Sequence, residues 1–239
     1  MTLFWTRTWD ALAGAVFPTP CVCCGDLIEA HDPPLCPGCW SRLPRIDTDQ
    51  CRCGSPLPAS PGEDCARCRR GRSIILEGAA LGFYAGPLRD CVVALKYGGR
   101  HRTAERLASR LRDDARCRAV LGASDLLVPV PLHGNRERGR GFNQAELLAR
   151  ALGRPSGVRV CRALTRTRDT RSQTDLSARD RRRNVENAFA VTAEARLEHA
   201  AVTLVDDVLT TGATLRECAA TLLAGGAREV RTITVARAE

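Results

Sequence analysis

The sequence predicts an α/β protein with a mostly parallel sheet covered by helices on both faces, preceded by a small cysteine-rich module. Two observations support this fold class. From residue 74 onward, short runs of β-branched and aliphatic residues alternate with amphipathic helical patterns, which is typical of βαβ units. Before residue 74, nine of the 13 cysteines fall between Cys21 and Cys68. We therefore divide the chain into a module at 1–73 and an α/β domain at 74–239.

Hydrophobic periodicity and chain breakers place the elements. We expect strands at 78–84, 125–130, 202–205 and 230–235, and helices at 88–96, 103–111, 143–152 and 214–223. Pro131 closes the second strand, and paired glycines at 98–99 and 225–226 stop two of the helices. Near the start of the chain, apolar residues from Leu3 to Val16 recur close to helical spacing, which predicts a short amphipathic helix packed on the body.

The composition narrows the class of protein and of partner. The chain has 239 residues, of which 44% are hydrophobic and 26% charged, as expected for a globular protein with a core. The formal net charge of +9 favours an anionic partner, such as nucleic acid, a phosphorylated metabolite or an acidic protein. No apolar run could span a bilayer, and Arg7 and Asp10 interrupt the N-terminal pattern, which argues against a secretory signal. We expect a cytoplasmic protein without membrane insertion and predict no particular oligomeric state.

The clustered cysteines repeat one spacing. Cys21-x-x-Cys24-Gly is followed after ten residues by Cys36-x-x-Cys39, and Cys51-x-Cys53-Gly is followed after ten residues by Cys65-x-x-Cys68. Each set can direct four thiolates to one point, which is the tetrahedral site that Zn²⁺ prefers, and a chain without a secretory signal favours metal over disulfides. Four thiolates leave no open coordination position, so the expected zinc is structural. The second set is the weaker prediction because its first pair is one residue short, and Cys23 stays outside both sets.

The stretch VDDVLTTGAT at 205–214 carries the clearest ligand-binding pattern. A buried strand leads into Asp206 and Asp207, at the carboxyl edge where ligands bind in parallel sheets. Side chains alternate along a strand, so both carboxylates can serve one ligand only if the strand ends here and the backbone turns. Vicinal sugar hydroxyls are suitable donors for them. The next residues open a helix whose amides and dipole would hold a phosphate: Thr210, Thr211, Gly212, Ala213 and Thr214. We interpret the stretch as a cradle for a 5-phosphorylated sugar rather than an acidic helix cap.

The longer stretch VTLVDDVLTTGAT resembles the phosphoribosyl-pyrophosphate motif of type I phosphoribosyltransferases. Three further stretches and the N-terminal cysteines resemble the ComF family of competence-associated proteins, over nearly the whole chain: LKYGGR at 95–100, LVPVPLHGNRERGRGFNQAELLA at 127–149 and RTRDTRSQTDLSARDRRRNVENAF at 166–189. The resemblance implies a type I phosphoribosyltransferase-like domain that takes phosphoribosyl pyrophosphate with Mg²⁺, and a role in competence and DNA uptake.

The resemblance also implies a pyrophosphate site. Residues 130–133, which begin with Val130 and Pro131, would form a short loop that presents backbone N–H groups to pyrophosphate. The guanidinium groups that follow suit phosphate oxygens, although each alone can also be a solvated charge: Arg136, Arg138 and Arg140. Glycines at 139 and 141 would make this segment mobile.

Two other features have alternative interpretations. Lys96 is the only lysine among 36 basic residues, and it could bind phosphate or could simply favour the end of a helix. The polar, arginine-rich segment 165–183 could be a lid that excludes water from the site, or a solvated basic loop.

Three functional hypotheses follow. In the first, a phosphoribosyltransferase, Asp206 and Asp207 orient the ribose, Mg²⁺ bridges the diphosphate and ribose hydroxyls, and an unidentified nucleophile displaces pyrophosphate, with the cysteine-rich module as a candidate hood. In the second, a non-catalytic zinc-containing protein of natural transformation contacts single-stranded DNA or a helicase partner. Only 4% of the residues are aromatic, which counts against strong direct binding of single strands. The third, a purely structural zinc scaffold, leaves the sugar-phosphate pattern unexplained.

Overall fold

The structure is a computed structural model of the chain, and it describes residues 19–28, 34–46, 50–55, 57, 64–70, 73–97, 101–168 and 184–238. The predicted N-terminal helix, the glycines at 98–99 and most of the segment 165–183 lie outside the described residues. Within the described residues, no helix is both long and apolar enough to cross a membrane.

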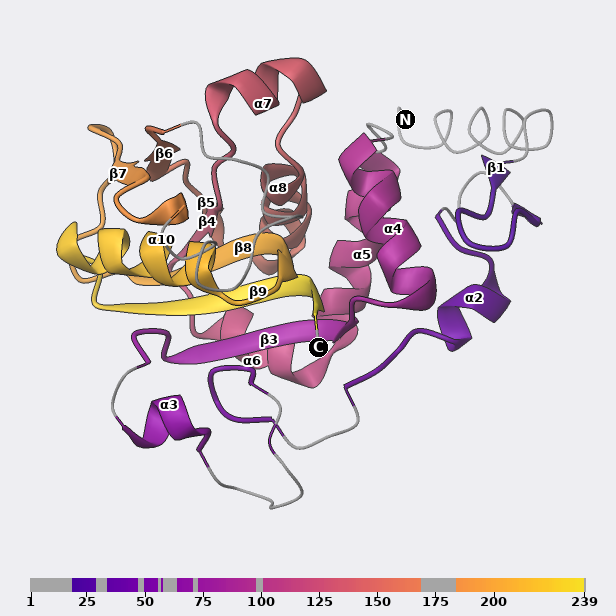
Figure 1. Cartoon of the computed structure of the whole chain (residues 1–239), viewed down its shortest axis with the longest axis horizontal. Helices are drawn as coiled ribbons and strands as arrows, with labels where there is room; N and C mark the ends of the chain where they lie inside the picture. The colour runs from indigo at the N-terminus through magenta and orange to yellow at the C-terminus, as the bar shows by residue number, and fades with distance from the viewer. Residues whose placement is uncertain are drawn as a thin grey trace, which may run out of the picture.

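A five-stranded, fully parallel sheet forms the centre of the α/β domain (Figure 1). Its strands lie in the order β3 (Glu77–Phe83), β9 (Glu229–Arg237), β8 (Ala201–Leu209), β4 (Leu126–Pro129) and β5 (Arg159–Val160). Val205 pairs with Ile233 on one side of β8, and Thr203 pairs with Leu127 on the other. The parallel sheet predicted from alternating patterns is confirmed, and all carboxyl ends of its strands meet at one edge.

Helices cover both faces of this sheet. One face packs against α4 (Gly86–Tyr97), α5 (His101–Asp113), α6 (Ala115–Gly122) and α8 (Gln144–Ser156). The other packs against α10 (Ala213–Ala224). Strand residues alternate between the two cores, since Leu127 joins the first core and Leu126 the second. The four predicted helices correspond to α4, α5, α8 and α10, each with slightly different ends.

Besides α6 and β5, two parts of the α/β domain were not predicted from the sequence. One is an antiparallel pair of short strands, β6 (Leu164–Arg166) and β7 (Phe189–Val191), which lies over the α10 side. The other is a short helix, α7 (Gly134–Arg140), in the arginine-rich segment that we expected to be mobile. Because α7 has no buried residue, it leaves no hydrophobic period in the sequence. Gly141 ends α7 in the left-handed region with φ 81°, so this glycine caps a helix.

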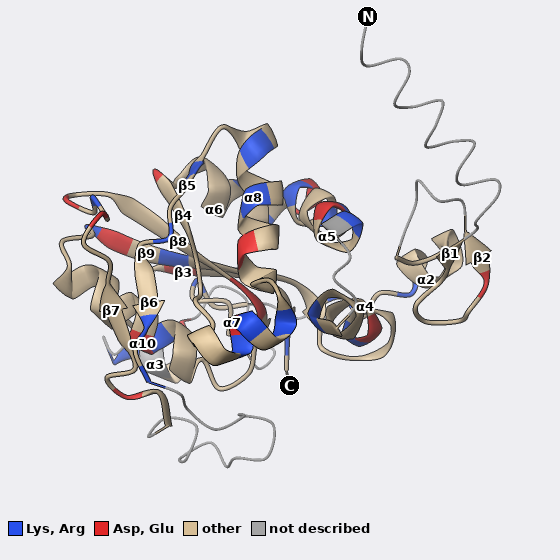
Figure 2. Cartoon of the chain, turned by 90° about the horizontal axis from the view of Figure 1, so that it is seen from above, with Lys and Arg blue, Asp and Glu red and all other residues tan. Residues whose placement is uncertain are grey.

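The cysteine-rich module contacts the domain in two separate places (Figures 1 and 2). Its first half, with β1 (Thr19–Pro20), β2 (Leu27–Ile28) and α2 (Pro37–Ser41), shares a core with α4 and α5. There the guanidinium of Arg110 lies 4.9 Å above the ring of Trp40. The second half, with α3 (Ala66–Arg69), lies beside β3. The module therefore supports two different parts of the domain.

The module covers the outer edge of β3. The amide of Gly78 donates to the Arg52 carbonyl, and the amide of Phe83 donates to the Pro44 carbonyl, each at 2.8 Å. This approach is so close that a Cβ on Gly82 would lie 2.3 Å from the Pro44 oxygen. Pairing the edge satisfies amides that would otherwise invite aggregation.

Candidate functional site

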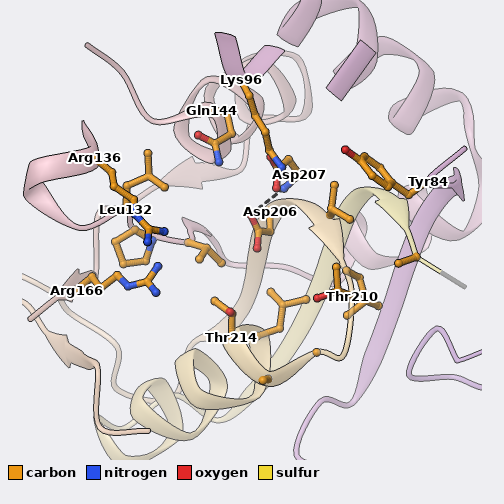
Figure 3. Close-up of a pocket in the computed structure, with 18 of the residues that line it drawn as sticks. Tyr84, Lys96, Leu132, Arg136, Gln144, Arg166, Asp206, Asp207, Thr210 and Thr214 are labelled. Atoms are coloured by element: carbon orange, nitrogen blue, oxygen red, sulfur yellow. Dashed lines mark hydrogen bonds and ion pairs between the residues drawn. The ribbon is translucent and has the colours of Figure 1, made fainter. Parts of the chain in front are cut away.

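A cavity of about 540 Å³ opens at the carboxyl edge of the sheet. Its walls come from the end of β8, the start of α10, the loop after β4, α7, the end of α4 and β6 (Figure 3). Eleven of the site residues predicted from the sequence line it: Lys96, Val130, Pro131, Arg136, Arg140, Asp206, Asp207, Thr210, Gly212, Ala213 and Thr214. Segments far apart in the chain therefore meet where the fold class predicts a ligand.

The two aspartates lie within β8, and the expectation that the strand ends at this pair is wrong. β8 continues to Leu209, because its ladder with β9 extends through Val208 and Leu209. The side chains consequently alternate: Asp206 is directed toward the loop before α10, and Asp207 toward Lys96 (Figure 3). Both still line the cavity, so the carboxylates border one space from different sides.

Asp207 has a cationic partner. Its Oδ2 lies 3.0 Å from Nζ of Lys96, and the aspartate is only 5% exposed. Burial lowers the pKa of Lys96, but the adjacent Asp207 carboxylate raises it more, so the net direction is upward. Lys96 therefore stays charged and compensates a buried carboxylate.

Asp206 has a different environment. Its Oδ1 accepts a hydrogen bond of 2.8 Å from the amide of Asp207, and no other described residue forms an ion pair with it. Burial, together with the neighbouring Asp207 charge, raises the pKa of Asp206 well above its ordinary value. This carboxylate would gain from a cation or from hydroxyl donors supplied by a ligand.

The loop before α10 opens toward the cavity. Gly212 is the N-cap of α10, with φ 71° and no side chain to cap the first turn. A Cβ at this position would lie 2.8 Å from Nη1 of Arg216, which donates to the Thr211 carbonyl at 2.8 Å. Thr211 itself does not line the cavity; its hydroxyl oxygen accepts a 3.4 Å hydrogen bond from the Ala213 amide. The start of this helix provides amides and a positive dipole end for an anion.

Arginines form the opposite wall. Arg136 projects into the cavity from α7, and Arg140 also lines it, with its guanidinium 5.5 Å from the ring centre of Tyr97 (Figure 3). Arg138 does not reach the cavity: it is exposed and donates to Oδ1 of Asn135 on its own helix. The helical geometry of α7 separates these neighbours, since residues two apart lie on different sides of a helix.

Several lining residues had no assigned role from the sequence. Arg166 projects into the cavity from β6, is 9% exposed, and stacks over Phe189 at 5.4 Å. Gln144, at the start of α8, accepts a hydrogen bond from Arg140. Arg166 and Gln144 lie inside the stretches that carry the family resemblance, and this membership was the sequence signal that could have indicated a role in the site. Tyr84 and Tyr97, the two tyrosines of the chain, also line the cavity, and no local pattern could show this.

Both cysteine sets form compact clusters with the geometry of a metal site. In each set the four sulfur atoms lie within 4.8 Å of one another. Sγ of Cys24 is 3.6 Å from Sγ of Cys36, and Sγ of Cys53 is 3.7 Å from Sγ of Cys65. Zn–S bonds of about 2.3 Å imply tetrahedral S···S distances of about 3.8 Å, so both sets fit structural zinc.

The short spacing of the second set does not prevent this arrangement. Gly54 follows Cys53 with φ 79°, as Gly25 follows Cys24 with φ 80°, so both turns adopt the same backbone bend. No described residue of the module lines the cavity, so the expectation that the module forms a hood has no support in the described part of the chain.

Comparison with known families identifies both parts of the chain. Residues 12–69 match the double zinc ribbon domain, and residues 138–239 match the phosphoribosyl transferase domain. The matched regions include both cysteine clusters, the loop before α10 and the two aspartates. Together with the parallel sheet, they show a phosphoribosyltransferase-like α/β fold preceded by a zinc ribbon module.

Two relatives match most of the length of this chain. DNA utilization protein YhgH of Escherichia coli K12 is 37% identical over 210 residues, covering 83% of this chain and 91% of the relative. Competence protein F of Haemophilus influenzae is 31% identical over 224 residues, covering 91% of this chain and 96% of the relative. Among solved structures, the glutamine phosphoribosylpyrophosphate amidotransferase from B. subtilis, complexed with ADP and GMP, is 20% identical. It aligns with 60% of this chain and 30% of its own, with a TM-score of 0.41.

Proposed function

Because the chain belongs to the ComF family of competence-associated proteins, we propose that its cavity binds phosphoribosyl pyrophosphate together with Mg²⁺. One observation carries this proposal: a helix start with glycine as its N-cap, two carboxylates and an arginine wall line a single cavity. These are the three kinds of group that a phosphate, a pentose and a diphosphate require.

The ligand would extend across the cavity. Its 5-phosphate would lie at the loop of Thr210 and Gly212, where α10 begins. The ribose hydroxyls would donate to Asp206, whose pKa is raised by burial and by the neighbouring Asp207 charge. The diphosphate would lie beside the loop of Val130 and Pro131, between Lys96 and the arginines of α7 and β6.

The carboxylates of the cavity, together with the phosphates of the ligand, offer the oxygen atoms that Mg²⁺ prefers. Mg²⁺ prefers oxygen ligands and usually keeps several waters, with one or two carboxylates and substrate phosphates completing its shell. Asp206 could supply a carboxylate oxygen, directly or through water. When bound, the metal would supply positive charge that neutralises the diphosphate oxygens.

The residues of the chain would then favour departure of pyrophosphate from C1 of the ribose. Arg136, Arg140 and Arg166 would stabilise the negative charge that develops on the leaving group. Asp206 would hold the ribose in a fixed orientation toward an acceptor, and the ion pair of Lys96 with Asp207 would hold the second carboxylate in place beside it. Turnover with such an acceptor would make the protein a phosphoribosyltransferase.

Calorimetry with Mg²⁺ and phosphoribosyl pyrophosphate tests the proposal. The wild type should show saturable heat, and Asp206→Asn should weaken binding. Two arginines of one helix give a matched pair: Arg136→Ala, at the cavity, should reduce affinity about tenfold or more, as expected for a lost charge-assisted contact, whereas Arg138→Ala should not. Absence of binding by the wild type would refute the proposal.

The names of the relatives support a cellular role in competence and DNA utilization, which we propose for this chain. The net charge of +9 supports a second candidate activity, direct contact with single-stranded DNA. Binding measured over a range of salt concentrations tests this second activity, because neutralised phosphates give a steep loss of affinity with salt. If the chain instead binds a helicase partner, single-stranded DNA alone should show no salt-dependent binding.

A further inference from the structure

The helix α7 carries two of the cavity arginines but has no hydrophobic anchor. None of its seven residues is buried, and basic side chains dominate it (Figure 2). Most helices in proteins are held by an apolar face packed on the core. The position of Arg136 and Arg140 at the cavity must therefore depend on polar contacts between α7 and the rest of the domain.

Arg162 makes such a contact from a distant part of the chain. It lies between β5 and β6, and its Nη2 is 3.4 Å from Oε1 of Glu137 on α7. The same nitrogen also forms an ion pair with Oε2 of Glu146, in the first turn of α8. The backbone of Arg162 is itself held, because its carbonyl accepts a 3.1 Å hydrogen bond from the Thr192 hydroxyl. One guanidinium thus joins α7, α8 and the strand pair.

The two carboxylates depend on Arg162 to different extents. Glu146 is 6% exposed and has a second partner, Arg150, whose Nη2 lies 2.6 Å from Oε1. Burial raises the pKa of Glu146, but Arg162 and Arg150 lower it more, so the net direction is downward. Among the described residues, Glu137 forms an ion pair with Arg162 alone. Loss of Arg162 would leave Glu146 compensated and would release Glu137.

We propose that Arg162 is a positioning residue: through Glu137 it holds α7 in place, and so sets the position of Arg136 and Arg140 at the cavity. The inference deepens the proposed function, on which its ligand measurements rest. It adds a residue that does not line the cavity and that acts only through α7. The side chain of Arg162 is 63% exposed and the buried Glu146 keeps its second partner Arg150, so loss of Arg162 should cost little global stability. Its effect should appear in the geometry of the site.

Two variants separate positioning from general support of the fold. Arg162→Met removes the link to α7, whereas Arg150→Met removes the other partner of Glu146 and leaves the link to α7 intact. We expect Arg162→Met to bind Mg²⁺–phosphoribosyl pyrophosphate roughly fivefold more weakly, the equivalent of about 1 kcal/mol for one such ion pair. Arg150→Met should bind like the wild type, and both variants should melt close to it.

A second ligand provides a readout that a merely structural role would not give. Ribose 5-phosphate has the phosphate and pentose but no diphosphate, so it should not use α7. Its affinity should therefore be equal in wild type and Arg162→Met. A parallel loss of affinity for both ligands, or an equal loss in Arg150→Met, would overturn the proposal.

Hydrogen exchange of the free protein tests the tether without any ligand. Amides of residues 134–140 should exchange faster in Arg162→Met than in Arg150→Met. In a double-mutant cycle, Glu137→Gln should hardly change the exchange rates of residues 134–140 further once Arg162 is replaced. Unchanged exchange in Arg162→Met would refute the tether. Faster exchange in Arg162→Met, together with a wild type that binds no phosphoribosyl pyrophosphate, would refute only the proposed function.

Discussion

Nζ of Lys96 lies 3.0 Å from Oδ2 of Asp207, and this ion pair joins the end of α4 to the strand β8 inside the candidate site. Asp207 is buried, so its charge needs compensation within the protein. The only lysine of the chain is therefore a partner of one aspartate of the motif, besides any contact it makes with a phosphate.

Replacing Lys96 with Met should destabilise the protein by about 3 kcal/mol, because it leaves a buried carboxylate without its cation. The double variant Lys96→Met/Asp207→Asn should regain much of this loss, since it removes the stranded charge as well. Urea unfolding of the four proteins of this cycle measures the coupling. If the two single effects simply add, the ion pair has no energetic role.

Asp206→Asn should change the pH dependence of stability. The pKa of Asp206 is raised in the folded protein above its ordinary value of 3.8, because burial and the Asp207 charge disfavour the ionised form. The folded state therefore binds a proton more tightly than the unfolded state, and stability falls as pH rises from 3.8 through the folded pKa. The variant lacks this loss, so it should be more stable than the wild type at pH 8 and not at pH 4.

The measurement is unfolding by denaturant at a series of pH values, with Arg138→Ala as a control that changes a charge outside the cavity. A difference between Asp206→Asn and the wild type that stays constant from acid to neutral pH would contradict a raised pKa. Binding of Mg²⁺–phosphoribosyl pyrophosphate should tighten as pH rises through the same range, because the ionised carboxylate is the form that accepts hydroxyl hydrogens.

Gly82→Ala should separate the module from the edge of β3. The new Cβ would lie 2.3 Å from the Pro44 oxygen and 3.1 Å from Cδ2 of Leu88, and a backbone oxygen cannot move away cheaply. We expect a loss of roughly 1–3 kcal/mol, as for overpacked sites, and faster exchange of the Phe83 amide. Gly122→Ala, at a helical position where the added Cβ would meet nothing within 4 Å beyond its chain neighbours and its own helix backbone, should be neutral or stabilising.

Metal analysis should find two zinc ions per chain, because both cysteine sets have the same compact geometry. Cys24→Ser and Cys53→Ser should each lose about one equivalent, since serine is a poor substitute for a thiolate ligand. Cys23→Ser is the control, because Cys23 is exposed and belongs to neither cluster. Full zinc content in Cys53→Ser would show that the second cluster does not bind metal through this residue.

The sequence by itself determined much of the local chemistry. The duplicated cysteine spacing predicted two four-thiolate clusters, and the run VDDVLTTGAT predicted a strand followed by the start of a helix. These predictions succeeded because a turn between cysteines, or a strand followed by small residues and a helix, depends on neighbours in the chain. The parallel sheet also followed from local hydrophobic periods.

Only the tertiary structure decided which side chains share the site. Helix α7 gave no hydrophobic period, and its winding directs Arg136 into the cavity and leaves Arg138 outside. The pair of Lys96 with Asp207, and that of Arg162 with Glu137, join segments that are distant in the chain. Such contacts depend on the order of the strands in the sheet and on where each strand ends. Both are decided by packing between elements, so a local sequence pattern does not reveal them.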